Sequence, residues 1–574
     1  MHLPSLRVLA AVTLLPLLAA CAGLAPVAPP RPAAAEALPE VTLSDDILYD
    51  VLLGEIASQR GQIGVTALTL GRVAQKTRDP RLAERATLAA LYARQYGEAQ
   101  KSAQLWVELR PEDVEAREAL ATVLLELDRP AEARTHFETM LAIETGRRNL
   151  EQAYPRIAAA LSRQANKPGT LELMQALVAR QPRNATAHFA LAHLAVRAGD
   201  LARAGAAAER ALALRPGWEE AAQFRARILV SQKDTARALA FYESFLRDNA
   251  GATATRLSYA RFLIDQKLWE QALEQFRQIV ASSPEDADVI YAVGLLSLQT
   301  NRLAEAEKYL KLALKLRPAN DQARFYLGEV AEQGKRHAEA IAWYRGIGPG
   351  ENYFEAQARL GIVLARQGDL AAARQHLQGI AAENDTQRVQ LVLAEEQVLR
   401  EARQYREALD MLGRALTALP ENKDLLYARS LIAEKLNLIE IAERDLRAIL
   451  KQDAKNANAL NALGYMLADR GQRLDEAQSL LREAMTLKPD DAFILDSYGW
   501  LQYRLGNSAE AIKFLRRALE LRSDAEISAH LGEVLWVAGD RREAESVWDR
   551  ALKDTPDNEA LIGVINKFRE KRKE

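Results

Sequence analysis

The chain has 574 residues, with 76 basic and 78 acidic side chains and a formal net charge of -2. This length is too great for one compact core, so either several domains or an array of repeats is expected. The balanced charge gives no electrostatic reason to expect a nucleic-acid partner. The single cysteine, Cys21, excludes an intramolecular disulfide and a structural metal site made of cysteines.

The N-terminus has the pattern of a secretory signal. Arg7 precedes the apolar run VLAAVTLLPLLAA, which is short for a membrane-spanning helix and is typical of the central region of a signal peptide. We therefore expect residues 1–20 to be a signal that is removed. Residues 21–42 are rich in proline and lack helical periodicity, so they are predicted to form an extended tether.

The end of the apolar run, Leu18-Ala19-Ala20-Cys21, resembles the lipobox of bacterial lipoproteins. The resemblance implies that Cys21 is acylated and anchors the mature chain to a membrane. Ala22 follows the cysteine, and in such lipoproteins the absence of aspartate there favours the outer membrane. The expected location is thus the periplasmic face of the outer membrane.

The region after the tether has helical periodicity. Apolar residues in 43–79 predict two helices with a break near Arg60-Gly61, which form a degenerate first repeat, a cap or a docking element.

From there a single pattern recurs along the chain. Alanines mark thirteen units at the same phase, mostly 33 to 35 residues apart. They are Ala99, Ala133, Ala204, Ala238, Ala272, Ala306, Ala340, Ala373, Ala408, Ala442, Ala477, Ala511 and Ala544. Each unit has two apolar runs, which breaks such as Gly506-Asn507 separate. The alanine lies in the second run, and a small residue such as Gly499 lies in the first run of several units. The pattern predicts helix–turn–helix units in residues 80–148 and 183–557, each leaning on its neighbours.

Three segments interrupt this regularity. Residues 149–182 form an irregular unit, because Ala133 and Ala204 are 71 apart rather than two full periods. A second break lies at residues 345–352, where the second helix is expected to be cut short. Residues 558–574 are predicted to contain a final helix that caps the stack.

The length and the small, apolar and proline positions of the unit resemble the tetratricopeptide (TPR) repeat. The resemblance implies an all-α solenoid in which helix–turn–helix repeats wind into a right-handed superhelix. It also implies a protein-binding role, since the inner wall of that superhelix commonly receives partners.

No catalytic motif is found. None of the seven histidines has a partner at metal-ligand spacing, and His188 and His193, five residues apart, lie on different faces of one helix. No nucleotide-binding or serine-hydrolase string occurs. The expectation is a non-enzymatic protein without cofactor or metal.

The resemblance also assigns candidate binding residues. Fixed positions of the first helix build the inner wall in the TPR family. In the C-terminal repeats these positions hold Tyr427, Asn458, Asn461, Tyr465, Phe493, Trp500, Tyr503, Arg504 and Trp536. Aromatic, amide and arginine side chains of this kind are typical of protein-binding hot spots. Packing between repeats is the alternative role for any one of the aromatic residues.

The same positions predict a wall that changes sign along the chain. Earlier repeats contribute His193, Arg197, Arg227 and Arg261, and middle repeats contribute Glu329, Glu332, Glu355 and Glu401. The lysine-rich clamp by which some TPR proteins hold an acidic C-terminal peptide is absent.

Two hypotheses for the function follow. A lipobox, a tether and a long TPR array together resemble the lipoprotein partner of a periplasmic carboxyl-terminal processing protease. That resemblance implies a scaffold that binds the protease and peptidoglycan hydrolases and promotes their cleavage. The alternative is an assembly or biogenesis factor for a secretion, pilus or polysaccharide-export apparatus. Capture of partners from solubilised envelopes distinguishes the two.

Overall fold

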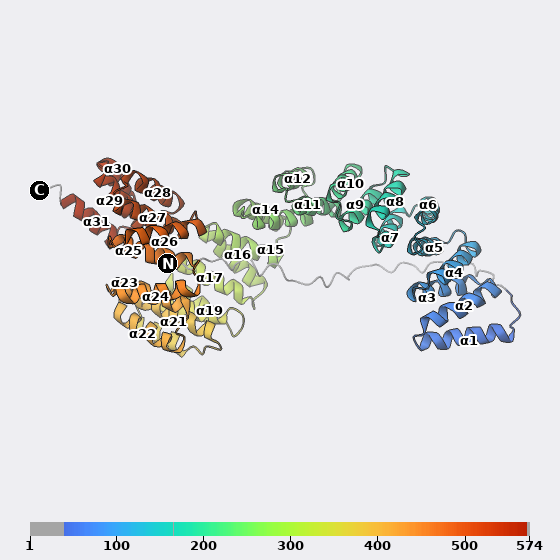
Figure 1. Ribbon diagram of the computed structural model, residues 1–574, viewed down its shortest axis with the longest axis horizontal. Coiled ribbons are helices and arrows are strands. Elements are labelled where there is room, and N and C mark those ends of the chain that lie inside the picture. Colours follow the sequence, from blue (N-terminus) through green and yellow to red (C-terminus); the bar gives the residue numbers. More distant parts are fainter. Residues whose placement is uncertain (1–39, 165, 571–574) are drawn as a thin grey trace. The chain divides into compact units, whose positions relative to one another are not determined.

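The computed structural model describes residues 40–164 and 166–570, and this part of the chain contains 31 helices and no strand. The predicted signal, the lipidation site Cys21 and nearly all of the tether lie outside the described residues. The described residues form two compact units, which divide between residues 258 and 259 (Figure 1). The all-helical architecture predicted from the periodicity is confirmed.

The first unit consists of α1 (Asp45–Gln59), α2 (Ile63–Thr77), α3 (Pro80–Tyr92), α4 (Tyr96–Leu109), α5 (Val114–Glu126), α6 (Pro130–Arg147), α7 (Leu150–Ser162), α8 (Lys167–Ala179), α9 (Ala185–Arg197), α10 (Leu201–Leu214), α11 (Glu219–Ser231) and α12 (Thr235–Asp248). Helix α13 (Thr253–Asp265) contains the division between the units.

The second unit continues with α14 (Trp269–Ser282), α15 (Ala287–Gln299), α16 (Leu303–Leu316), α17 (Asp321–Gln333), α18 (His337–Arg345), α19 (Tyr353–Arg366), α20 (Leu370–Gly379), α21 (Asp385–Glu401), α22 (Tyr405–Ala418), α23 (Lys423–Lys435), α24 (Ile439–Gln452), α25 (Ala457–Asp469), α26 (Leu474–Leu487), α27 (Ala492–Arg504), α28 (Ser508–Leu521), α29 (Ala525–Val537), α30 (Arg541–Asp554) and α31 (Glu559–Glu570).

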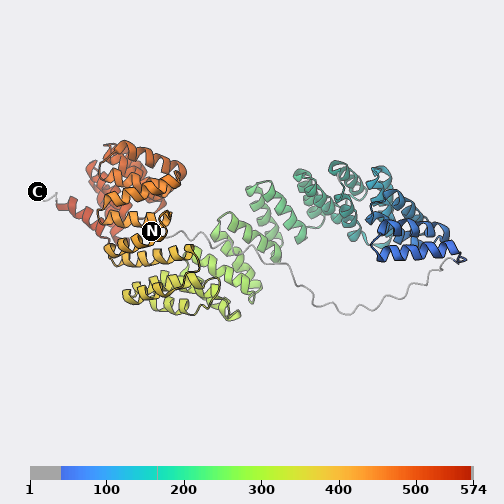
Figure 2. The same cartoon turned by 60° about the horizontal axis from the view of Figure 1, so that its bottom comes forward.

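Each helix pair begins and turns by local chemistry. At the start of α27, the Asp491 carboxylate accepts hydrogen bonds from the backbone N–H groups of Phe493 and Ile494, at 3.0 and 3.3 Å. Such a cap satisfies N–H groups that have no partner inside the helix. Between α27 and α28, Gly506 has a φ of 83°, a left-handed conformation that glycine adopts without steric cost. The result is a tight turn and two antiparallel helices (Figure 2).

Small residues set the distance between the two helices of a pair. A Cβ atom added to Gly499 would lie 2.8 Å from Cγ of Leu515 and 3.2 Å from the carbonyl oxygen of Ala511. The glycine therefore accommodates both the repeat-marking alanine of the second helix and the larger residue one turn later. Ala511 and Leu515 are themselves fully buried. This arrangement agrees with the prediction that small residues allow the helix axes to approach closely.

The predicted irregular segments also differ from the regular pairs in the structure. Helix α7 contains Pro155 and packs mainly against α9 rather than against its own partner α8. Helix α18 has only nine residues and ends at Arg345, where the 345–352 break begins. At the C-terminal end, α31 packs on α29 through Leu561, Ile565 and Phe568, which are buried.

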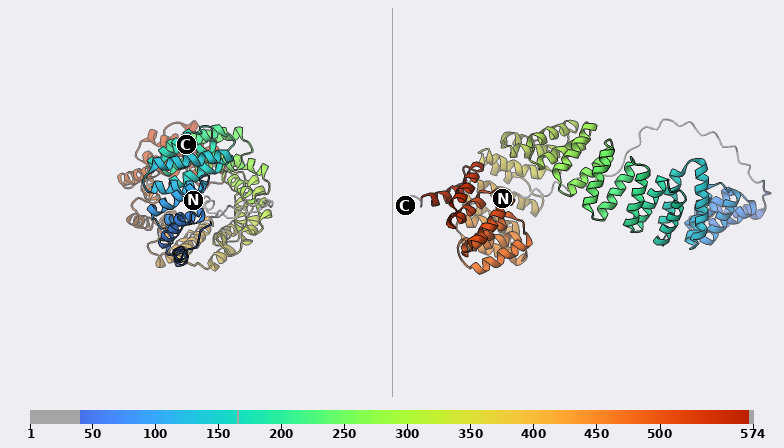
Figure 3. Two further views of the ribbon diagram at one scale, coloured as in Figure 1. Left: turned by 90° about the vertical axis from the view of Figure 1, so that its right-hand side faces the viewer. Right: turned by 90° about the horizontal axis from the view of Figure 1, so that it is seen from above.

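The first helices line one face of the second unit. Helix α19 packs on α21, α25 on α27, and α27 on α29, whereas each second helix packs chiefly against its own pair and the next first helix. We call the face formed by the first helices the inner face. Figure 3 shows the hairpins from two further directions. Within the described residues no helix has the length and hydropathy needed to cross a membrane.

Candidate binding surfaces on the inner face

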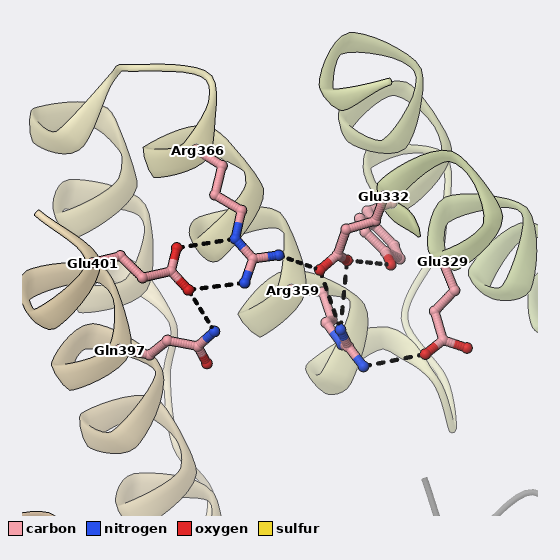
Figure 4. Close-up of polar contacts among 7 residues, drawn as sticks. Glu329, Glu332, Arg359, Arg366, Gln397 and Glu401 are labelled. Atoms are coloured by element: carbon pink, nitrogen blue, oxygen red, sulfur yellow. Dashed lines mark hydrogen bonds and ion pairs between the residues drawn. The ribbon is translucent and has the colours of Figure 1, made fainter. Parts of the chain in front are cut away.

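The middle of the inner face carries an ion-pair network across three successive first helices (Figure 4). Arg359 on α19 donates to Glu329 at 3.1 Å and to Glu332 at 3.3 Å, both on α17. Arg366, also on α19, donates to Glu332 at 2.8 Å. The same arginine makes two bonds to Glu401 on α21, at 2.8 and 3.0 Å. We call these five residues the Glu–Arg network.

Further hydrogen bonds complete this network. Gln397 donates to Glu401 at 2.9 Å (Figure 4). The hydroxyl of Tyr344 donates to Glu332 at 3.1 Å. Burial raises the pKa of Glu329, against the effect of Arg359. Burial opposes the charge on Arg359, but Glu332 and Glu329 outweigh it and raise the pKa of the guanidinium. The network therefore joins adjacent repeats through hydrogen bonds between charged side chains.

Arginines reduce the negative charge predicted for the middle of the wall. Glu329, Glu332 and Glu401 do not form an acidic surface, because Arg359 and Arg366 pair with them. Of the four glutamates predicted there, Glu355 is exposed. The prediction missed the two arginines because each pair is formed between residues about one repeat apart.

Three of the four basic residues predicted earlier in the chain contact neighbouring side chains. The ring of His193 on α9 stacks on Phe224 of α11 with centroids 3.9 Å apart, and burial lowers its pKa. Arg227 lies over the same Phe224 ring at 5.5 Å, and Arg197 donates to Ser162 at 3.2 Å. Arg261 is exposed.

A different cluster lies at the C-terminal end of the inner face, centred on His530 of α29. Its Nδ1 is 2.9 Å from a carboxylate oxygen of Asp496 on α27. Its ring stacks on Trp500 with centroids 4.3 Å apart, and its Nε2 is 3.4 Å from the hydroxyl of Tyr465 on α25. The Trp500 indole donates to Asp469 at 3.1 Å. Side chains from the two preceding first helices, α25 and α27, thus converge on the imidazole of α29.

We call the whole surface the aromatic–acidic wall. It consists of Tyr427, Glu434, Asn461, Tyr465, Asp469, Asp496, Trp500, Tyr503, Glu526, His530 and Glu533. These residues come from the first helices α23, α25, α27 and α29. The wall curves, because Tyr465 on α25 reaches His530 two helix pairs further along the chain.

The electrostatic field of the wall is negative. Burial raises the pKa of Tyr465, and Glu526, Asp469, Asp496 and Glu434 raise it further. Burial also raises the pKa of Glu434, with Asp469 and Glu526 adding to the effect against Lys435. The Tyr427 pKa rises to about 12 through burial and then through Glu434 and Asp491. For His530, burial opposes the charged form, but Asp496, Glu526 and Asp469 outweigh it and raise the pKa. Carboxylates of this face thus act together with burial on Tyr427, Tyr465 and Glu434, and against burial on His530.

Four of the nine predicted wall residues are half-buried on the inner face: Tyr427, Asn461, Tyr465 and Tyr503. Three others are exposed. Asn458 accepts a hydrogen bond from Lys488 at 3.1 Å, Phe493 lies beneath Arg522 at 5.0 Å, and Arg504 packs close to Gly471.

The two tryptophans lie deeper than the prediction placed them. Trp500 is 6% exposed and contacts two other wall residues, His530 and Asp469. Trp536 is 9% exposed and stacks on Trp548, with Phe568 of α31 also in contact. For Trp536 the alternative of packing between helices therefore describes its position.

Sequence reasoning did not name the acidic residues and the histidine of this wall. A signal for them was present, because Tyr465 and Asp469, Asp496 and Trp500, and Glu526 and His530 are each four residues apart. Residues at that spacing share a face of a helix. Within the described residues no group of three or more potential metal ligands occurs.

These features define a helix-hairpin repeat protein whose inner face carries polar and aromatic side chains. Three family models, each described as tetratricopeptide repeat, match the chain. One matches residues 68–147, 147–217, 291–352 and 433–492, a second matches 229–296, and a third matches 494–524.

A full-length relative extends this match. The chain is 34% identical over 494 residues to the TPR repeat-containing protein PA4667 of Pseudomonas aeruginosa, which covers 86% of this chain and 83% of that protein. The chain belongs to the tetratricopeptide repeat family, as the resemblance predicted.

Shorter stretches of the chain are similar to other proteins. Cellulose synthase operon protein C of Xanthomonas axonopodis pv. citri is 27% identical over 286 residues, or 45% of this chain and 18% of that protein. Type IV pilus assembly protein PilF of Pseudomonas aeruginosa is 25% identical over 128 residues, or 22% of this chain and 50% of that protein. Among solved structures, a thermophilic TPR protein of Thermus thermophilus is 23% identical, covers 32% of this chain and 97% of its own, and has a TM-score of 0.29.

Proposed function

We propose that this chain is a non-enzymatic scaffold lipoprotein of the outer membrane that promotes proteolysis by another protein. It is anchored through Cys21 and tethered by residues 21–42, so that its repeats face the periplasm. One region binds a carboxyl-terminal processing protease and another binds the peptidoglycan hydrolases that the protease cleaves. The scaffold role itself follows from membership of the TPR family.

The observation that carries the proposal is the presence of two chemically different open surfaces in one chain. The first unit exposes apolar side chains on its terminal helices, among them Leu52 on α1 at 52% and Tyr92 on α3 at 81%. Leu48, Leu52 and Ile56 on α1 are exposed and four residues apart, so they share one helix face. The second unit offers the aromatic–acidic wall. Exposed apolar clusters and aromatic polar walls are both typical of protein-binding sites.

Two such surfaces on one molecule explain how cleavage is promoted without catalytic residues. A protease and its substrate that bind the same chain meet at a raised effective concentration. A lipid anchor adds to this effect by confining the complex to the membrane surface.

The test is affinity capture of the lipidated, full-length chain from solubilised envelopes, followed by mass spectrometry. We expect a serine protease of the processing class together with peptidoglycan hydrolases. Variants with Leu48→Ser and Leu52→Ser should lose the protease and retain the hydrolases if the two surfaces act separately. Capture without any protease contradicts the proposal.

A second candidate is an assembly or biogenesis factor. It is favoured by the similarity to a cellulose synthase operon protein and to a type IV pilus assembly protein. In that case the same capture experiment recovers export or pilus subunits instead of a protease.

A further inference from the structure

A cleft of about 330 Å³ lies between α8 and α10, the second helices of two neighbouring pairs in the first unit. Its buried lining residues are all apolar: Val178 on α8, Leu191 on α9 and Ala207 on α10. Two arginines of α10, Arg203 and Arg210, also line the cleft, and none of the described residues that line it is acidic. The cleft therefore combines an apolar base with positive charge.

Neighbouring second helices elsewhere in the chain are bridged by ion pairs. Arg277 on α14 bonds to Glu305 on α16 at 2.8 Å, and Arg516 on α28 bonds to Glu543 on α30 at 2.6 Å. Each of these glutamates directly precedes the repeat-marking alanine of its helix. In α10 the same position holds Arg203, and among the described residues no ion pair joins α10 to α8. The cleft thus lacks the carboxylate that bridges the other two pairs of helices.

The two arginines of the cleft have little negative charge to balance them. Arg203 pairs at 3.3 Å with Asp200, the cap of its own helix, and its side chain is 39% exposed. Arg210 is exposed, and within the described part of the chain it makes no ion pair or hydrogen bond. Hydrogen bonds between a guanidinium and a carboxylate are stronger than those between neutral groups. The cleft is therefore electrostatically complementary to a carboxylate.

The shape of the cleft suits a helix. Ala179 on α8 and Ala206 on α10 are small, exposed residues that line it, and small residues let another helix approach closely. The lining residues of α10 stand at positions 203, 206, 207 and 210, so they share one face over about two helical turns. A helix of similar length can lie along that face with its own side chains against Leu191.

We propose that the cleft between α8 and α10 binds a helix of a partner protein that carries aspartate or glutamate beside small apolar side chains. The apolar side chains pack on Val178, Leu191 and Ala207, and the carboxylates pair with Arg203 and Arg210. The partner thus supplies the carboxylate that bridges neighbouring second helices elsewhere. The inference goes beyond the proposed function, because it uses neither the apolar face of α1 nor the aromatic–acidic wall.

Binding is measured directly, without a protease, so this inference and the proposed function fail separately. The probe is a fluorescein-labelled, alanine-rich helical peptide with leucines and glutamates on one face. It is titrated with the chain that lacks its signal and lipid, and fluorescence anisotropy gives Kd. The control peptide has lysines in place of the glutamates. We expect the glutamate peptide to bind, with an affinity that falls as salt is raised, and the lysine peptide not to bind.

The variant Arg203→Gln with Arg210→Gln removes both positive charges from the cleft. Its matched control is Arg237→Gln with Arg247→Gln on α12, where Arg237 likewise pairs with the cap of its own helix. The cleft variant should weaken binding of the glutamate peptide about tenfold, and the control should leave Kd unchanged. Equal Kd values for the two variants, equal binding of the two peptides, or no binding of the glutamate peptide overturns the inference.

A second measurement needs no variant. The glutamate peptide, carrying one benzoylphenylalanine, is photo-crosslinked to the unaltered chain, and the attachment sites are mapped by mass spectrometry. We expect them in α8 and α10. Crosslinks confined to other helices contradict the inference.

Discussion

At the scale of single residues, the fold depends on glycines that admit a large neighbour. A Cβ atom added to Gly532 on α29 would lie 1.9 Å from the indole nitrogen of Trp548, which is fully buried on α30. The tryptophan ring is enclosed by Trp536 and Phe568 and cannot move aside freely. We expect Gly532→Ala to destabilise the α29–α30 pair by about 1 to 3 kcal/mol.

Hydrogen exchange of the α29 and α30 amides measures this change. The matched control is Gly413→Ala on α22, where an added Cβ meets no atom within 4 Å. That substitution should stabilise its helix by about 0.5 to 1 kcal/mol, because alanine has the higher helix propensity. Slower exchange in Gly532→Ala would show that the close contact between residue 532 and Trp548 does not limit the stability of this helix pair.

The pair of His530 and Asp496 predicts how the stability of the fold depends on pH. The carboxylates near His530 raise the pKa of its imidazole above the ordinary value of about 6.5. A raised pKa contributes stability that is fully present below the unfolded value and is lost as pH rises through the folded value. The Tm of the unaltered chain should therefore exceed that of His530→Gln by more at about pH 5.5 than at about pH 8.5.

Circular dichroism melts of both proteins at the two pH values provide the test. A gap that widens at the higher pH would mean that the imidazole is held neutral, and the assignment of a charged pair would be wrong.

Residue identities on the inner face were partly predictable from the sequence. Tyr465 and Asn461 lie on the inner face where the repeat phase places them, whereas Trp536 takes the alternative role of packing between helices. Its position in the repeat is that of a wall residue, but α31 covers it through Phe568. A terminal repeat has no further repeat beside it. The position of a residue in the repeat does not show which segment packs there instead.

At the scale of elements, adjacent first helices are joined by charges. Glu332 on α17 holds both Arg359 and Arg366 of α19, and its side chain is 8% exposed. Glu332→Gln removes this charge, so that Arg359 and Arg366 each lose one ion pair. We expect a loss of about 1 to 2 kcal/mol, less than for a fully buried pair because both arginines are about one-third exposed.

The loss should be local, since a repeat contacts only its neighbours. Hydrogen exchange is expected to accelerate in α17 and α19 and to stay unchanged in α27 and α28. Glu355→Gln, which removes an exposed carboxylate from the same face, is the control and should have little effect. Acceleration spread evenly over the second unit would argue against nearest-neighbour coupling.

The helices themselves were predictable because a hairpin is specified within about one repeat of sequence. Gly499, Ala511 and Leu515 meet one another within a single pair. Ion pairs between repeats were not predictable from this pattern. Arg366 and Glu401 are 35 residues apart, and charged side chains at exposed helix positions have many possible partners.

At the scale of the whole molecule, the repeats supply surfaces for other proteins to bind. TPR membership accounts for the protein-binding role, and the two open surfaces support our proposal of a scaffold that brings a protease to its substrate. A passive scaffold has a kinetic property that an activator lacks. When the scaffold is in excess, protease and substrate occupy different copies and meet less often.

The most direct measurement is the rate at which the captured protease cleaves a peptidoglycan hydrolase, recorded over a wide range of concentrations of this chain. Our account predicts no cleavage by the chain alone, and a rate that rises, passes through a maximum and then falls. A rate that is independent of the chain, or one that rises to a lasting plateau, would contradict it.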